Sequence, residues 1–175
     1  MKSTADTYGA VARLVHWGSA LLILVLLGTG FCAGYAEDPA TKAAVLRVHL
    51  PVAILVLMLT LVRLVWWWRF DRRPGPVAGI PPWQERVAHW THRGLYLLLV
   101  LLLASGITMS AISGLPDALF GTAPLPDLSD LPPRAGHGLG ARLLAAAIAL
   151  HAGAALYHHW VLRDRTFRRM WSARG

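Results

Sequence analysis

Residues 136–162 read GHGLGARLLAAAIALHAGAALYHHWVL, and this stretch decides the fold that the rest of the chain must complete. It is largely small and apolar, yet it carries four of the eight histidines: His137, His151, His158 and His159. His137 and His151 are fourteen residues apart, so a helix places both on one face, about 21 Å apart along its axis. Because the hydrocarbon core of a bilayer is roughly 30 Å thick, we expect the two histidines near opposite surfaces of a membrane.

Histidines in such a segment are informative because ionisable side chains inside a membrane span are costly and usually functional. A single histidine could serve as a polar contact between helices. Two histidines on one face at this separation favour two cofactor sites at different depths. The other spans must then supply partner ligands at matching depths.

The composition predicts an integral membrane protein of one domain, residues 1–175. The chain is 55% hydrophobic and only 15% charged, with a mean hydropathy of +0.48, whereas soluble domains are about 25% charged. Its net charge of +8 comes from Lys and Arg at the ends of apolar segments, which favours the positive-inside rule over nucleic-acid binding. The single Cys32 excludes an internal disulfide and a cysteine-ligated cluster. The N-terminus lacks a signal-peptide pattern, so we expect the first span to be retained.

Four apolar segments predict an all-α, four-helix transmembrane bundle, with spans at about 14–34, 45–68, 89–112 and 137–162 and loops between them. Arginines are concentrated in two places, the loop after the second span and the C-terminal tail: Arg69, Arg72, Arg73, Arg86, Arg93, Arg163, Arg165, Arg168, Arg169 and Arg174. The positive-inside rule therefore places this loop and both termini in the cytoplasm.

This topology pairs the histidines by depth. His16 and His151 fall on the inner side, and His49 and His137 on the outer side. Each pair joins two helices at one level, which suits a flat cofactor clamped inside a bundle. Two imidazoles as axial ligands favour low-spin haem iron in electron transfer, so the sequence predicts two b-type haems. No C-x-x-C-H motif is present for covalent c-type attachment.

Two alternatives to haem remain open at this point. A structural zinc requires four ligands, usually with cysteine or carboxylate, which neither pair has nearby in sequence. The histidines could also be purely structural.

Gly30 and Arg63 each share a face with a predicted ligand, fourteen residues after His16 and His49 respectively. Gly30 would let a porphyrin press against the helix, although ordinary helix packing explains it equally well. Arg63 lies at inner depth, where it would neutralise a haem propionate. Snorkelling toward the cytoplasmic surface is its alternative.

The remaining histidines lie at the cytoplasmic end. His89 and His92 are i and i+3 neighbours, so at most one points inward, and either could replace His16 as the inner ligand. Otherwise they and His158 are candidates for binding or protonating a quinone. Contact with lipid headgroups is the alternative, and it is favoured for His159.

These residues fall in stretches that resemble the bacterial cytochrome b-561 family over nearly the whole chain. The stretches are RLVHW with His16, RVHLPVAILVLMLTLVRL with His49 and Arg63, AHWTHRGLYLLL with His89 and His92, AGHGLGARL with His137, and LHAGAALYHHWVLRDRTFRRM with His151 and His158. The resemblance implies a four-helix dihaem cytochrome of the bacterial inner membrane, with the same two haem pairs and with His158 contacting the quinone.

The members of that family that this chain resembles act as superoxide oxidases, which pass an electron from periplasmic superoxide through two haems to ubiquinone. The resemblance therefore implies a superoxide:ubiquinone oxidoreductase in the lipid bilayer, with no separate catalytic residue. The alternative is a non-enzymatic electron-transfer subunit that serves a redox partner protein, a membrane or periplasmic dehydrogenase or hydrogenase. Superoxide is an anion, yet the outer loops carry more acidic than basic residues. Electrostatic steering must then be local, from Arg47, Arg134 and Arg142.

Overall fold

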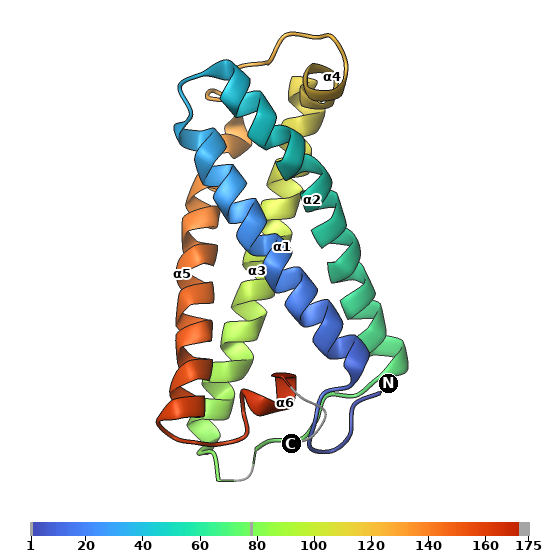
Figure 1. Ribbon diagram of the computed structural model, residues 1–175, viewed down its shortest axis with the longest axis vertical. Helices are drawn as coiled ribbons and strands as arrows, with labels where there is room; N and C mark the ends of the chain where they lie inside the picture. Colours follow the sequence, from blue (N-terminus) through green and yellow to red (C-terminus); the bar gives the residue numbers. More distant parts are fainter. Residues whose placement is uncertain (1, 78, 172–175) are drawn as a thin grey trace. The chain divides into compact units, whose positions relative to one another are not determined.

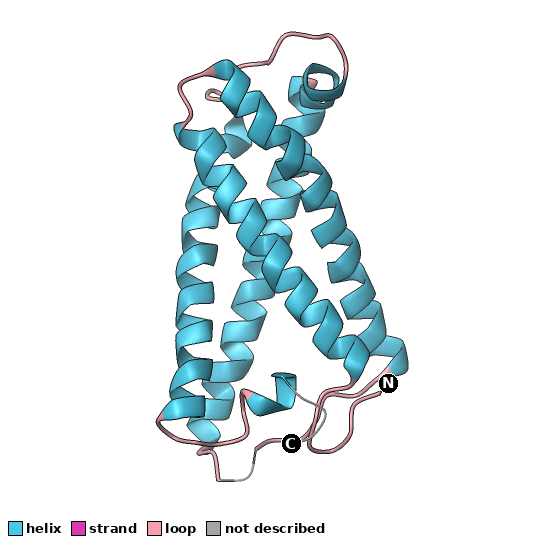
Figure 2. Ribbon diagram, viewed as in Figure 1, coloured by secondary structure: helices cyan, strands magenta, loops and turns pink. Residues whose placement is uncertain are grey.

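The computed structural model describes residues 2–77 and 79–171, and these residues form helices and loops without a strand (Figure 2). The elements in chain order are α1 (Ala10–Tyr35), α2 (Pro39–Val65), the π-helical turn η1 (Trp66–Phe70), α3 (Pro82–Ser113), α4 (Leu115–Phe120), α5 (Pro132–Trp160) and α6 (Arg168–Trp171), as labelled in Figure 1. Four helices are long and apolar enough to cross a membrane: α1, α2 with η1, α3 and α5. The predicted all-α membrane class is confirmed.

Large apolar side chains remain exposed along all four long helices, for example Leu24, Ile54, Leu101 and Leu150. Contiguous exposure of this kind would be an aggregation hazard in water. In a bilayer it is the expected surface, because lipid tails are as apolar as leucine. The helical backbone satisfies its own hydrogen bonds, as a membrane span requires.

The long helices extend beyond the apolar runs read from the sequence, and α2 shows why. The carboxylate of Asp38 accepts hydrogen bonds from the backbone N–H groups of Thr41 at 2.8 Å and Ala40 at 3.3 Å. Asp38 is therefore the N-cap, and Pro39 takes the first helical position, where its missing N–H costs nothing. The hydrogen bonds from Thr41, first of all that from its hydroxyl, also lower the pKa of Asp38.

Two short helices, α4 and α6, lie in stretches that the sequence indicated only as loop and tail. α4 follows Gly114, whose φ of +66° is in the left-handed region that favours glycine. Its side chains Leu115 and Leu119 are buried against Ala33 and Leu46. A helix of six residues is too short to show a helical period in the sequence, so its hydrophobic residues were indistinguishable from those of a loop.

The described residues divide into two compact units, and each long helix contributes one section to each unit. The first unit contains residues 2–20, 58–77, 79–95 and 146–171, and the second contains residues 21–57 and 96–145. His16, His92, His151, His158 and Arg63 belong to the first unit, and His49 and His137 belong to the second.

The first unit is held together at its loops by Arg169, which is only 8% exposed. Its Nε donates to the carbonyl of Asp6 at 2.7 Å, and its Nη2 donates to the carbonyl of Gly75 at 2.8 Å. α6 therefore lies beside the N-terminal segment and the loop that follows η1 (Figure 1). A buried guanidinium needs such partners, because an unpaired buried charge is strongly unfavourable.

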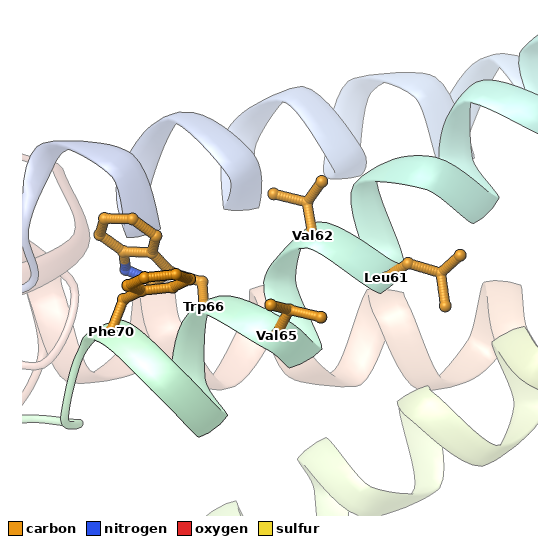
Figure 3. A pocket seen from close by; sticks show the side chains of 5 residues that line it. All are labelled: Leu61, Val62, Val65, Trp66 and Phe70. Atoms are coloured by element: carbon orange, nitrogen blue, oxygen red, sulfur yellow. The ribbon is translucent and has the colours of Figure 1, made fainter.

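The end of α2 borders a small cavity of about 280 Å³ with an entirely apolar lining: Leu61, Val62, Val65, Trp66 and Phe70. Figure 3 shows the rings of Trp66 and Phe70 side by side at one end of it, with centroids 5.6 Å apart. All five residues come from α2 and η1, so the cavity is a feature of one helix surface.

Candidate functional site

His49 on α2 and His137 on α5 face each other in the second unit. Their ring centroids are 6.4 Å apart and their ring planes are inclined by 65°. The sequence predicted this pair from depth alone, although the two histidines are 88 positions apart in the chain. The structure brings these two predicted partners together.

Each of these imidazoles is held by a hydroxyl that the sequence analysis did not identify. Thr29 Oγ1 lies 3.0 Å from His49 Nδ1, and Ser105 Oγ lies 2.8 Å from His137 Nδ1. Both hydroxyls also bond to a carbonyl of their own helix, Thr29 to Val25 at 2.7 Å and Ser105 to Leu102 at 3.0 Å. A hydroxyl has one hydrogen to donate, so it accepts from the ring. Nδ1 therefore carries the proton, and Nε2 keeps a lone pair for a metal.

A glycine follows each hydroxyl residue and lets the ring come close. A Cβ added to Gly30 would lie 3.2 Å from Cε1 of His49, and one added to Gly106 would lie 3.4 Å from Cε1 of His137. The structure thus places the imidazole ring of His49 against Gly30. The pattern was readable in the sequence, because Gly30 and Gly106 each stand fourteen residues after a histidine, His16 and His92.

The first unit contains a second pair with almost the same geometry. The ring centroids of His16 on α1 and His151 on α5 are 6.5 Å apart, with the planes inclined by 67°. His92 on α3 joins them, with its ring 5.1 Å from that of His151 and its Nδ1 donating to the Ala88 carbonyl at 2.7 Å. His89 is exposed and is bonded through Nδ1 to the Glu85 carbonyl at 2.8 Å. Of the two neighbours on α3, only His92 lies with the pair.

Both pairs have the separation that one iron between two imidazoles requires. A metal–nitrogen bond of about 2 Å on each side, plus roughly 1.1 Å from nitrogen to ring centre, gives about 6.2 Å between centroids. The observed separations are 6.5 Å and 6.4 Å. His92 and His151, at 5.1 Å, are too close for this arrangement. Among the described residues, no group of three or more histidine, cysteine or acidic side chains is arranged to hold a metal ion.

Two residues of α1 that flank His16 in the sequence carry buried polar atoms without partners. Arg13 Nη1 and Ser19 Oγ are buried and have no hydrogen-bond partner among the described residues, and each stands three positions from His16 on α1. Buried polar groups are normally satisfied. Their presence beside His16 fits a cofactor that carries its own polar groups, as the propionates of haem do.

Arg63 lies beside His16, with Nη2 3.4 Å from Nδ1 of the ring. A guanidinium can only donate, so this contact needs a lone pair on Nδ1. Iron binding through Nε2 places a proton on Nδ1 instead. The contact and metal binding at Nε2 therefore exclude each other, and Arg63 must turn to another acceptor when His16 is a ligand.

Two arginines converge beside His137. A Cβ added to Gly138 would lie 3.1 Å from Arg134 Nη1 and 3.5 Å from Arg142 Nη1. Arg142 also donates to the Gly138 carbonyl at 3.2 Å and to the Tyr35 hydroxyl at 3.5 Å. We call the two guanidinium groups next to Gly138 the arginine notch. Arg47, by contrast, already donates its Nε to the Leu119 carbonyl at 2.8 Å.

His158, near the end of α5, is paired with Asp164 through Nδ1. His159 turns elsewhere, with its ring 5.1 Å from that of Phe167. Trp17, next to His16 in the sequence, donates its indole N–H to the Met170 carbonyl at 2.9 Å, and its ring contacts His16 edge-on at 5.3 Å. The C-terminal segment therefore contacts Trp17, which follows the predicted ligand His16 in the sequence.

Comparison with known proteins identifies the family to which this arrangement belongs. Residues 7–173 match the sequence profile of a family described as prokaryotic cytochrome b561. The chain belongs to this family. The resemblance seen in the sequence is thereby confirmed, and the family carries out membrane electron transfer with haem b.

Three curated relatives cover almost the whole chain. Cytochrome b561 homolog 2 of Escherichia coli K12 is 29% identical over 177 residues, covering 96% of this chain and 93% of the relative. Cytochrome b561 homolog 1 of the same organism is 28% identical over 163 residues, covering 89% and 92%. A probable superoxide oxidase of Yersinia pestis is 31% identical over 173 residues, covering 93% and 94%. These coverages indicate that the relatives have about the same length as this chain, as expected for proteins that share one fold within the cytochrome b561 family.

Proposed function

We propose that this cytochrome b561 holds two haem b groups, one between His16 and His151 and one between His49 and His137. The observation that carries the proposal is that both pairs, on different helix sections, have ring separations of 6.5 Å and 6.4 Å. Haem held by two axial imidazoles supplies one-electron transfer, because its iron keeps no open position for a substrate. Arg63 would pair with a propionate of the haem at His16.

We further propose that the chain oxidises superoxide and reduces ubiquinone. Two superoxide anions each lose one electron to give two molecules of dioxygen, and ubiquinone takes up the two electrons and two protons to give ubiquinol. The relative at 31% identity that is named a probable superoxide oxidase supports this assignment. In this scheme the chain is a multi-pass protein of the bacterial inner membrane, with both termini and the loop after η1 in the cytoplasm.

The arginine notch supports an anionic electron donor at the His49–His137 pair. Two guanidinium groups that approach one glycine repel each other, and an anion between them would offset this repulsion. Gly138 follows His137 directly, so an anion in the notch lies within one residue of a proposed ligand. Local attraction of this kind can steer superoxide even though the outer loops carry an excess of acidic residues. The reason is that steering depends on the electrostatic field at the site where the anion enters.

His158 is the proposed quinone contact, since it is a polar side chain near the end of a membrane-spanning helix. A quinone reduced there needs protons, and an imidazole can deliver them near neutral pH. His89, which is exposed, is the next candidate for quinone contact. His92 is the third, although its ring lies against His151.

The decisive experiment mixes the purified oxidised cytochrome with superoxide in a stopped-flow instrument, with superoxide dismutase as the control. We expect haem reduction at a rate approaching the diffusion limit of about 10⁸–10⁹ M⁻¹s⁻¹, followed by ubiquinol formation when ubiquinone is present. Arg142→Gln should slow haem reduction by superoxide several-fold and weaken its dependence on ionic strength. Arg47→Gln is the matched control, because no atom of Arg47 lies within 4 Å of the position that a Cβ on Gly138 would take.

A second function, electron transfer from a redox partner protein, is favoured by the acidic balance of the loops around α4, where Asp117, Asp127 and Asp130 are set against Arg134. Such a surface suits a basic partner. If superoxide reduces the haems no faster in the absence than in the presence of dismutase, this second function replaces the first.

A further inference from the structure

The chain reverses direction immediately after α5, and this reversal brings a carboxylate onto His158. Arg163 has a φ of +54°, in the left-handed region that costs a residue with a side chain roughly 1 kcal/mol or more. The backbone N–H of Asp164 then donates to the carbonyl of His158 at 3.1 Å. The turn thus fixes the backbone of Asp164 directly against the residue that its side chain contacts.

Both oxygens of the Asp164 carboxylate are used. Oδ2 contacts Nδ1 of His158, and Oδ1 accepts the backbone N–H of Thr166 at 2.8 Å. The two side chains of the pair are only 17% and 18% exposed.

The carboxylate is ionised at neutral pH. Partial burial acts to raise the pKa of Asp164, but the hydrogen bonds from His158 and Thr166 outweigh it and hold the pKa below its usual value. An ionised carboxylate can only accept, so Nδ1 of His158 must be the donor. The proton on Nδ1 leaves Nε2 as the nitrogen that exchanges protons with other molecules.

We infer that Asp164 is a positioning residue that fixes the tautomer and orientation of His158 so that its Nε2 delivers a proton to the reduced quinone. This inference rests on the proposed function. In the step, the Nε2–H bond of the imidazolium breaks and an O–H bond forms on the quinone oxygen, while the electrons come from superoxide. The imidazole returns to its neutral form and takes its next proton from water. The carboxylate holds the ring in one orientation before the transfer, as carboxylate–histidine pairs do in other enzymes.

If the Asp164 carboxylate served only to close the turn after α5, it would not need to contact His158. Asp127 provides the comparison, because its Oδ1 accepts the backbone N–H of Ser129 at 2.9 Å and the Ser129 hydroxyl at 2.8 Å. That carboxylate closes a local turn in the same way as Asp164 does with Thr166, but no ring contact involves it within the described residues. Asp127→Asn is therefore a matched control for the loss of a turn-forming carboxylate.

The first test measures quinone reduction in proteoliposomes with ubiquinone for Asp164→Asn, Asp164→Glu and Asp127→Asn. For Asp164→Asn we expect unchanged haem content and unchanged haem reduction by superoxide, with kcat for quinone reduction lowered about tenfold or more, since a positioned proton donor contributes about 10²–10⁴ in rate. KM for ubiquinone should change little, because the quinone contact itself remains. Asp164→Glu should restore part of kcat, and Asp127→Asn should match the parent.

The second test asks whether Asp164 acts through His158. In a double-mutant cycle, Asp164→Asn should have no further effect on kcat once His158 is already Gln. Additive losses would show that Asp164 acts independently and would overturn the inference. ¹⁵N spectra of the neutral His158 ring provide a readout that does not depend on turnover. We expect a proton on Nδ1 in the parent and a mixture of tautomers in Asp164→Asn, and identical spectra would also overturn it.

The outcomes separate this inference from the proposed function. If the parent reduces ubiquinone and Asp164→Asn does so at the parent rate, the inference fails and the proposed function stands. If the parent is reduced by superoxide but forms no ubiquinol, the proposed quinone reaction fails, and the role given to Asp164 fails with it.

Discussion

Thr29 accepts a hydrogen bond from Nδ1 of His49 over 3.0 Å while it donates its own hydrogen to the Val25 carbonyl over 2.7 Å. The direction of both bonds follows from the single hydrogen of the hydroxyl. One side chain on α1 thus determines which nitrogen of a proposed ligand on α2 is available to iron. Ser105 on α3 does the same for His137 on α5.

The first prediction is that Thr29→Val weakens the binding of the haem that we propose at His49. Valine keeps the size of the side chain but cannot hold the ring, and loss of such a support typically costs about 10–100-fold in metal affinity. Haem retention under a competing apoprotein measures the change. Thr108→Val is the control, because the Thr108 hydroxyl also bonds to a carbonyl of its own helix, that of Ala104 at 2.9 Å. Equal haem loss from both variants would refute the role of Thr29.

The second prediction concerns the ligands themselves. Replacing His16 or His151 with alanine should remove one haem and leave the other, and replacing His49 or His137 should remove the other one. The reason is that each proposed haem iron would need both imidazoles of its pair for a low-spin site. Haem content by the pyridine haemochrome method and the low-spin signals in electron paramagnetic resonance measure this.

The control for the ligand variants is His89→Ala, which should keep both haems because His89 is exposed and bonded to its own helix. Full haem content in His16→Ala would identify a different ligand in the first unit. His92, whose ring lies 5.1 Å from that of His151, would then take the place of His16.

The histidine pairs could be predicted from the sequence because the spacing of residues along a helix determines their depth in the membrane. His137 and His151 share a face of α5, and the charges of the loops orient each span, so the partners of both followed without a structure. The supporting residues could not be found in this way. In an apolar run, Thr29 and Ser105 read as small residues, and only the packing of neighbouring helices shows that their hydroxyls reach a ring.

The turn at Arg163 was beyond the sequence for a different reason. Its φ of +54° is unusual for arginine, which has no preference for the left-handed region. A reading of the tail as a basic, cytoplasmic segment therefore gave no reason to place Asp164 against His158. The start of α2 lies before the predicted span because its cap, Asp38, is outside the apolar run that marks the span.

The third prediction concerns the acid stability of the N-terminal segment. Burial acts to raise the pKa of Asp71, but hydrogen bonds from Ser3, Trp66 and the backbone of Arg72 hold it below its usual value. A depressed pKa stabilises the folded state above the unfolded value of about 3.9, and this stability is lost as the pH falls through the folded pKa.

The hydrogen-exchange rate of the amides near Ser3, corrected for the intrinsic rate, should therefore increase as the pH falls below about 4. Asp71→Asn should exchange faster at neutral pH and lose most of this pH dependence. Asp130→Asn serves as the control in a loop of the second unit. A parent-like pH profile in Asp71→Asn would show that other groups hold the segment.

The fourth prediction concerns Arg63, which we expect to pair with a propionate of the haem at His16. Removing a cation near the haem stabilises the ferric state, so Arg63→Gln should lower the midpoint potential of that haem. We expect a decrease of roughly tens of millivolts, where about 59 mV corresponds to a tenfold change in the equilibrium constant of a one-electron reduction. A redox titration measures both haems. Arg72→Gln, at an exposed position in the same unit, should leave both potentials unchanged. Parent-like potentials in Arg63→Gln would leave snorkelling as the role of Arg63.

The last prediction compares two glycines on one turn of α1. A Cβ at Gly30 would lie 3.2 Å from His49 Cε1, whereas one at Gly28 would meet nothing within 4 Å. Alanine is favoured over glycine in a helix by about 1 kcal/mol, so Gly28→Ala should keep both haems and raise the Tm. Gly30→Ala gains the same helix preference but pushes the ring that Thr29 holds, so the haem at His49 should be lost more readily and its low-spin signal should shift. If both variants keep parent-like spectra and haem content, the close approach of His49 to α1 is not required for haem binding, and Gly30 serves ordinary helix packing.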